Sequence, residues 1–235
     1  MRLQPTLYLF IPALLPLLLV VNLTHADFQD GLDAYDRGDY PTALNEFLPL
    51  AEQGDVKAQF NMGILYEKGQ GVPQDFQEAF RWYGLAAEQG DAHTQNVVGM
   101  LYEFGQGVPQ DYTQALYWYG LAAQQGYAKG QFNLGFMYAT GVGVPQDYIE
   151  AGRWYWLAAQ QGEADAQHNL GYLYHVGQGG LTQNFVQAHM WYNLAAAQGV
   201  ENARELRDHV ASLMTPTEFA EAQQLASEWS PLPNP

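Results

Sequence analysis

The sequence predicts an all-α fold, a solenoid of about five helical hairpins followed by a C-terminal helical cap. Three observations indicate it: a repeat of 36 residues, helical spacing within each repeat, and helix start and stop signals at fixed places. Four full repeats at fixed spacing do not arise by chance. The residues that mark them are Gly54, Gly90, Gly126 and Gly162; Gly63, Gly99, Gly135 and Gly171; Tyr66, Tyr102, Tyr138 and Tyr174; and the pairs Trp82-Tyr83, Trp118-Tyr119, Trp154-Tyr155 and Trp191-Tyr192.

Each repeat is expected to contain two helices, of which the first spans Val56 to Lys68 in the first full repeat. Gln59, Gly63 and Tyr66 fall at i, i+4 and i+7, on one stripe of that helix. A glycine costs about 1 kcal/mol of helix propensity, so its return in four repeats needs a packing reason. We expect close approach of the second helix, through the small residues Ala79, Ala86 and Ala87.

The turn between the two helices carries a stop signal and a start signal. Gly69 is placed to end the first helix, and Pro73 follows a few residues later. The fourth of these turns, Gly177 to Gln183, has one extra residue. Capping boxes are predicted to open the second helices, from the pairs Asp75 with Glu78, Asp111 with Gln114, Asp147 with Glu150, and Asn184 with Gln187.

These signals divide the chain into a leader, a repeat region and a cap. The predicted repeats are a short first unit at 27–54, then 55–90, 91–126, 127–162 and 163–199. Residues 200–235 are predicted to form the cap, with one helix from Glu201 to Leu213 and another opened by Thr215 and Pro216. The proline-rich segment from Ser230 to Pro235 is expected to fray.

Residues 1–26 are typical of a signal peptide. Arg2 precedes an apolar run of 15 residues from Leu7 to Val21, and Thr24-His25-Ala26 offers small residues for cleavage. A spanning helix needs roughly 20 apolar residues, and this run is shorter. We therefore expect export to the periplasm or medium with cleavage before Asp27, and membrane attachment only if the leader is retained.

Composition excludes several classes of function. The formal net charge of −16 repels phosphate backbones, so nucleic acid is not an expected partner. The absence of cysteine excludes disulfides, thiolate catalysis and zinc-thiolate sites. The only serines, Ser212, Ser227 and Ser230, fall in the tail, which argues against a serine nucleophile with a triad. The sequence predicts no catalytic residue and no cofactor.

The repeat resembles a known family. The pattern Ala58-Gln59-x-Asn61-x-Gly63-x-x-Tyr66, then Gly69-x-Gly71-Val72-Pro73-Gln74-Asp75, then Ala79-x-x-Trp82-Tyr83-x-x-Ala86-Ala87-x-x-Gly90 is similar to the Sel-one-like repeat, a branch of the tetratricopeptide class. The resemblance covers roughly residues 27–199. It implies a right-handed superhelix of antiparallel helix pairs that acts as an adaptor or scaffold. A few cysteine-rich relatives are linked to penicillin binding or β-lactam hydrolysis, but this chain lacks their cysteines.

A partner-binding surface is predicted from positions that differ between the repeats. They fall at i, i+3, i+7 and i+10 on the first helix, which is one helical face, and the tetratricopeptide class implies that this face lines a concave groove. The positions are Lys57, Phe60, Ile64 and Glu67; His93, Asn96, Met100 and Glu103; Lys129, Phe132, Phe136 and Ala139; and Asp165, His168, Tyr172 and His175. The expected apolar floor is Phe60, Met100, Phe132, Phe136 and Tyr172, and the expected charged edges are Lys57, Lys129, Glu67 and Glu103.

Two alternatives stay open for the aromatic residues. Phe60 and Phe132 either contact a partner or fill space between neighbouring helices. The recurring tryptophans resemble a sugar-stacking ladder, but their fixed spacing and alanine neighbours favour a place in the core.

Asp165, His168 and His175 form the one cluster that suggests chemistry. Their spacing permits a metal site, a pH-sensitive binding patch, or solvent-facing polar residues. The seven-residue separation of the two histidines places their backbones about 10 Å apart, which disfavours one metal ion between them.

The leading hypothesis is a monomeric, non-catalytic adaptor of the cell envelope that binds a protein or peptide. A carbohydrate- or peptidoglycan-binding module and a β-lactam-recognising hydrolase are the alternatives.

Overall fold

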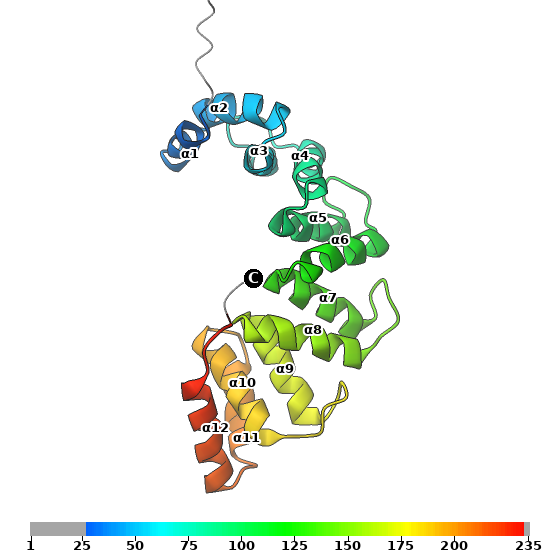
Figure 1. The fold of residues 1–235 in the computed structure, drawn as a ribbon, viewed down its shortest axis with the longest axis vertical. Coiled ribbons are helices and arrows are strands. Elements are labelled where there is room, and N and C mark those ends of the chain that lie inside the picture. Colours follow the sequence, from blue (N-terminus) through cyan, green and yellow to red (C-terminus); the bar gives the residue numbers. More distant parts are fainter. Residues whose placement is uncertain (1–26, 233–235) are drawn as a thin grey trace, which may run out of the picture.

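The computed structural model describes residues 27–232, and within that range the chain folds into helices without strands. Figure 1 shows successive antiparallel hairpins stacked along an arc that is hollow on one side. This confirms the predicted all-α solenoid. The helices are α1 (Phe28–Asp36), α2 (Tyr40–Glu52), α3 (Val56–Lys68), α4 (Phe76–Glu88), α5 (Ala92–Phe104), α6 (Tyr112–Gln124), α7 (Ala128–Thr140), α8 (Tyr148–Gln160), α9 (Ala164–Val176), α10 (Phe185–Ala197), α11 (Ala203–Ala211) and α12 (Pro216–Glu228). We call α3, α5, α7 and α9 the A helices, and α4, α6, α8 and α10 the B helices.

The leader predicted at residues 1–26 lies outside the described residues. Within residues 27–232, none of the helices combines the length and the apolar character needed to cross a bilayer.

The B helices begin at the predicted caps, but the reciprocal half of the capping box is missing. Asp75 accepts hydrogen bonds from the backbone N–H groups of Gln77 and Glu78 at 2.9 and 3.1 Å. The Glu78 carboxylate turns to Arg81 instead of reaching back to the cap, with a contact of 2.9 Å. In α4 and α8, a surface ion pair in the first turns of the helix therefore takes the place of the second cap bond. A complete capping box is present in the C-terminal helical segment, where Thr215 precedes α12.

The recurring glycine of each A helix allows the tyrosine ring of the paired B helix to lie flat against it. A Cβ atom added to Gly63 would stand 2.5 Å from the ring of Tyr83, and one added to Gly99 would stand 2.6 Å from the ring of Tyr119. The predicted close approach is confirmed, but the expectation that alanines are the contacting residues is wrong. The large ring fills the space that the missing Cβ leaves.

Successive hairpins are joined by a buried glutamine relay. The Gln131 amide on α7 donates to the carbonyl of Ala123 at the end of α6, at 3.3 Å. Its oxygen accepts from Gln161, which follows α8, at 2.8 Å. Gln59, Gln95 and Gln167 make the same pair of bonds in the other repeats. Each A helix is thereby tied both to the preceding hairpin and to its own B helix.

The A helices form the inner side of the arc. The Asn133 amide on α7 donates to the Asn96 oxygen on α5 at 2.8 Å. The ring of His93 at the start of α5 lies between those of Phe60 on α3 and Tyr127, with centroids 4.9 and 5.8 Å away. In a curved stack, successive helices approach one another most closely on the concave side. Direct contacts between successive A helices are therefore expected there. The implied concave position is therefore supported by these contacts for α3, α5 and α7.

The recurring tryptophans belong to the packed interior. Trp82 and Trp191 are buried, while Trp118 and Trp154 are half-buried against neighbouring repeats. The indole nitrogens of Trp82, Trp118 and Trp191 are enclosed. These rings therefore do not form an exposed stacking ladder, and the core interpretation is confirmed.

The C-terminal segment docks on the solenoid, so the prediction of fraying from residue 230 is wrong for residues 230–232. The ring of Trp229 packs edge-on against Trp191, with 6.2 Å between centroids. The Leu232 N–H donates to the carbonyl of Gln160 at the end of α8, at 2.8 Å. The tail covers the end of α8 because this backbone bond and the tryptophan contact together offset the cost of ordering it.

His189 on α10 lies in the contact with the cap, where it is buried against the ring of Phe219. Burial lowers its pKa; nearby Arg207 lowers it further, and Asp208 opposes the change. Because the folded pKa lies below the unfolded value of about 6.5, the unfolded chain takes up the proton first as the pH falls. The contribution of His189 to the free energy of unfolding is therefore lost as the pH falls below about 7.

We expect His189→Leu to reduce the acid sensitivity of the fold. Leucine occupies the equivalent position 116 of the second full repeat, so it suits this helix. The midpoint of thermal unfolding of wild type and variant at pH 7.5 and pH 5.5 checks this. The other titrating groups are shared, so their contribution is removed when the two proteins are compared. An equal fall in the unfolding midpoint of both proteins would contradict it.

Candidate partner-binding groove

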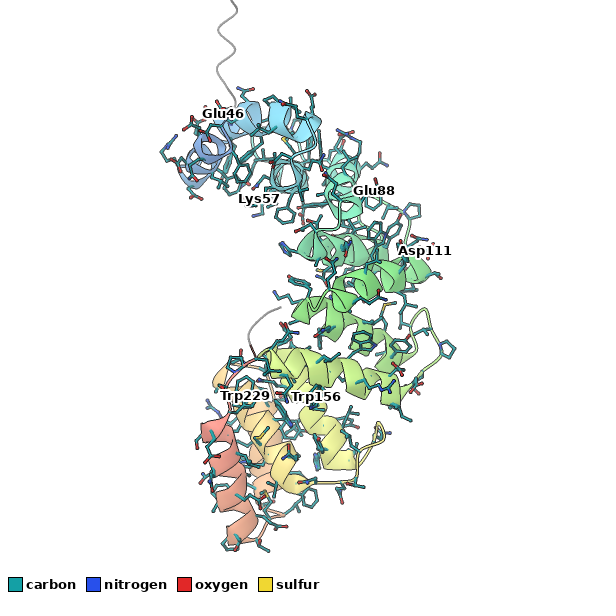
Figure 2. The ribbon with its side chains drawn as sticks, viewed as in Figure 1. Glu46, Lys57, Glu88, Asp111, Trp156 and Trp229 are labelled. Carbon is teal, nitrogen blue, oxygen red and sulfur yellow. The ribbon has the colours of Figure 1, made fainter. Side chains whose placement is uncertain are left out.

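The predicted groove residues at the start of the A helices form a row that is exposed to solvent. It consists of Lys57, His93, Lys129 and Asp165, at the start of the four A helices. Figure 2 shows Lys57 directed to the hollow side and Asp111 on the outer side. The row carries cations on α3 and α7 and an anion on α9, so its charge changes along the groove.

A second row presents large apolar side chains to solvent. Met100, Phe136 and Tyr172 are 42%, 43% and 46% exposed, at equivalent positions of three successive A helices. Ile64 continues the row on α3 and is half-buried. We call these four residues the apolar row. Exposed apolar residues that recur at equivalent places in successive repeats are typical of an interaction surface.

The neighbouring row of predicted groove residues packs into the core of the solenoid instead of facing solvent. Phe60 lies 5.4 Å from the ring of Tyr83, and Phe132 lies 6.0 Å from the ring of Tyr155, both centroid to centroid. Asn96 is only 3% exposed. The prediction that Asn96 faces a partner is wrong, because its oxygen is taken by Asn133 inside the stack. For Phe60 and Phe132 the space-filling alternative is favoured.

The predicted acidic edge is not made of free carboxylates. Glu67 accepts a hydrogen bond from the hydroxyl of Tyr83 at 2.6 Å, and Glu103 accepts one from Tyr119 at 2.5 Å. Burial and these carboxylates raise the pKa of both tyrosines far above the ordinary value. Each carboxylate therefore satisfies a buried hydroxyl of the B helix. Ala139, at the equivalent position of α7, carries no such group.

The fourth repeat brings His168 and His175 onto the ring of Tyr192, with centroids 5.6 and 6.3 Å away. Burial lowers the pKa of His168, and Asp165 opposes the change; burial and His209 lower the pKa of His175. Within residues 27–232, no three His, Cys, Asp or Glu side chains are placed to hold one metal ion. The cluster is therefore a patch of partly buried imidazoles whose pKa values lie below the ordinary value for histidine.

Sequence reasoning missed a cavity of about 690 Å³ between α8 and the turn after α9. Its lining includes Gly152, Trp156 and Tyr174. Where the first full repeat meets the second, Phe80 on α4 fills the space beside Tyr102 on α5, with centroids 5.3 Å apart. Gly152 stands at the position of Phe80 and leaves the equivalent space beside Tyr174 open. Comparing the residues at this position in the four repeats could have revealed the cavity from the sequence.

Solved structures of repeat proteins resemble this fold closely. A protective antigen of uropathogenic Escherichia coli with an SLR fold, c5321, is 32% identical with a TM-score of 0.75, over 86% of this chain and 45% of that one. A Sel1 repeat protein from Oxalobacter formigenes is 28% identical with a TM-score of 0.74, over 88% of this chain and 86% of that one. This chain thus spans less than half of the first relative's length and most of the second's.

Curated relatives match over a short segment. DAP3-binding cell death enhancer 1 from rat and from mouse is 39% identical over 49 residues, which is 21% of this chain and 10% of each relative. The match covers too little of those proteins to carry their activity here.

The family model described as Sel1 repeat matches residues 56–91, 92–127, 128–163 and 164–200, which together exceed half of the chain. These segments contain every A and B helix, the glutamines of the relay and the apolar row. The chain therefore belongs to the Sel1 repeat family.

Proposed function

We propose that this protein is a non-catalytic scaffold of the cell envelope that binds a protein or peptide along its concave face. Sel1 repeat proteins generally mediate protein–protein interactions and are typically non-catalytic. The observation that carries the proposal is the apolar row, in which Met100, Phe136 and Tyr172 are exposed on three successive A helices. Large apolar side chains at the centre of a groove are the usual anchors of an interface.

The groove suits an extended or helical segment of a partner. The apolar row supplies the anchors, while Lys57, Lys129 and Asp165 beside it set the polarity of the edge. The exposed ring of Phe136 packs against that of Phe132, with ring centroids 6.3 Å apart, and this contact restricts its motion. A pre-organised side chain loses little conformational entropy on binding, which favours affinity.

The cellular place of the scaffold rests on the leader. A basic residue, an apolar run and small residues before Asp27 support export and cleavage. The recurring tryptophans that resemble a sugar-stacking ladder are buried or half-buried in the described repeats, which counts against their use in the carbohydrate-binding alternative. A protein or peptide partner is therefore the better-supported ligand class.

Partner capture tests the proposal. We expect Phe136→Ser/Tyr172→Ser to weaken binding of an envelope protein by at least about tenfold, because truncating an interface anchor costs more than about 1 kcal/mol. The matched control is Tyr117→Ser/Ile149→Ser, which removes two exposed apolar side chains of the B helices. Proteins retained from an envelope extract are identified, and their Kd values are then measured with purified components.

Retention of the partner by wild type and control, with loss from the groove variant, is the expected pattern. Equal retention by all three proteins would exclude the apolar row as the binding surface. Circular dichroism of the variants excludes unfolding as the cause, since all four residues are exposed.

A further inference from the structure

The B-helix tyrosines that face the A helices have equivalent places in the four repeats but differ in their hydrogen-bond partners. The hydroxyl of Tyr83 is taken by the carboxylate of Glu67, and that of Tyr119 by Glu103. The side chain of Asn169 acts on the hydroxyl of Tyr155 and opposes the rise of its pKa that burial causes. Tyr192, in the fourth repeat, has no partner for its hydroxyl although the residue is 0% exposed. A buried hydroxyl without a partner costs about 1–3 kcal/mol, so an acceptor is expected there.

The residues around Tyr192 explain why the acceptor is missing. His175 occupies the position of Glu67 and Glu103, so the internal carboxylate is absent. His168 occupies the position of Phe60 and lies against the same tyrosine ring. The Nδ1 atoms of both histidines are buried and also without partners. Three buried polar groups without partners therefore belong to rings that pack on one another between α9 and α10, and each of them can donate a hydrogen bond.

We propose that Tyr192, His168 and His175 form a subsite for a carboxylate of the bound partner. The protein itself shows the chemistry, because a carboxylate takes the tyrosine hydroxyl in two equivalent repeats at 2.6 and 2.5 Å. In the fourth repeat the carboxylate comes from the ligand, as an Asp or Glu side chain or as a chain terminus. This inference rests on the proposed function, since it places an acidic group at one end of the peptide groove.

The surrounding charges favour an anion once the imidazoles are protonated. His209 on α11 lies 5.6 Å from His175, centroid to centroid, and adds a third imidazole. Asp165 on α9 opposes an incoming anion, and Tyr172 on the same helix acts electrostatically on Tyr192. On α11, Arg207 and Asp208 form an ion pair of 2.6 Å and offset each other. A carboxylate stabilises imidazolium, so its binding is expected to strengthen as the pH falls from 7.5 to 6.

Small acyl dipeptides test the subsite directly. N-acetyl-Phe-Glu-amide offers a side-chain carboxylate, N-acetyl-Phe-Phe offers a terminal carboxylate, and N-acetyl-Phe-Gln-amide is the neutral control. Each is titrated at pH 6.5 into the protein while the imidazole C–H signals are followed by NMR. We expect at least one acidic dipeptide to shift the signals of His168 and His175 with a Kd roughly tenfold below that of the neutral control.

Two variants and a matched control identify the groups. Tyr192→Phe keeps the ring that packs on Gly171 and removes the hydroxyl, so the Kd of the acidic dipeptide should rise roughly tenfold. His175→Glu restores the arrangement of the first two full repeats and should abolish binding of the acidic dipeptide by occupying Tyr192. Ala139→Glu adds the same charge one repeat away and should leave that binding within about twofold, since the more distant charge is screened by 0.15 M salt.

Failure of this inference is distinguishable from failure of the scaffold function. If the acidic and neutral dipeptides bind alike, or if His175→Glu binds the acidic dipeptides as wild type does, the carboxylate subsite is wrong. Partner capture that still depends on Phe136 and Tyr172 would then leave the scaffold function standing. Selective binding of acidic dipeptides with no capture would support the subsite and count against the apolar row.

Discussion

Gly107→Ala is expected to lower the free energy of unfolding by about 2–5 kcal/mol, from backbone strain and overpacking together. Gly107 has a φ of +72°, and a Cβ atom there would lie 1.9 Å from the carbonyl oxygen of Phe76. Phe76 opens α4, so this turn of the second full repeat rests on the B helix of the first. A backbone atom cannot turn away as a side chain can, so the two hairpins would have to separate.

Gly90→Ala is the matched control for the Gly107 variant. Gly90 has a φ of +97° but nothing within 4 Å of an added Cβ. It therefore carries the cost of the left-handed backbone, about 1–2 kcal/mol, without the clash. Urea unfolding followed by circular dichroism gives both midpoints. Equal losses would show that contact with α4 does not matter. Separate transitions for Gly107→Ala would show that the array has divided between its first and second full repeats.

Gln131→Leu is expected to cost about 1–3 kcal/mol, because two hydrogen bonds of the buried relay disappear at once. Gln131 is buried, and leucine has a similar volume but cannot bond to Ala123 or Gln161. Gln124→Leu, on the exposed end of α6, is the control and should change the midpoint little. The measurement is the urea midpoint of the two variants.

A double variant separates the relay from general packing. Gln131 and Gln161 share one bond, so Gln131→Leu/Gln161→Leu should cost less than the sum of the single losses. Strict additivity would contradict the relay as a unit. The same comparison applies to any of the four repeats because the pair recurs in each.

Repetition in the sequence made the fold predictable. The period, the turn glycines and the cap residues act locally, within one helix or one turn, so the hairpins and most helix ends could be assigned. The inner position of the A helices followed from the family resemblance. The sequence predicted a close approach at Gly63 but not the residue that makes it, because the ring that fills its space belongs to Tyr83, twenty residues later.

The sequence predicted which face of the A helices forms the candidate site, but not which residues of that face are exposed to solvent. Phe132 and Phe136 both vary between repeats, yet one packs on Tyr155 and the other is exposed. Helical periodicity places both on one side and cannot show where a neighbouring ring covers them. Asn96 was misassigned for the same reason, since its partner Asn133 lies on the next A helix.

The sequence by itself determined that this chain is a Sel1-type array of helical hairpins, because its signals are short-range and repeated. Only the tertiary structure decided which groove residues meet solvent, which carboxylates are already used, and that Tyr192 lacks an acceptor. Those properties depend on atoms from different helices and repeats. Burial and hydrogen bonding between them are set by packing distances that spacing along the chain does not fix.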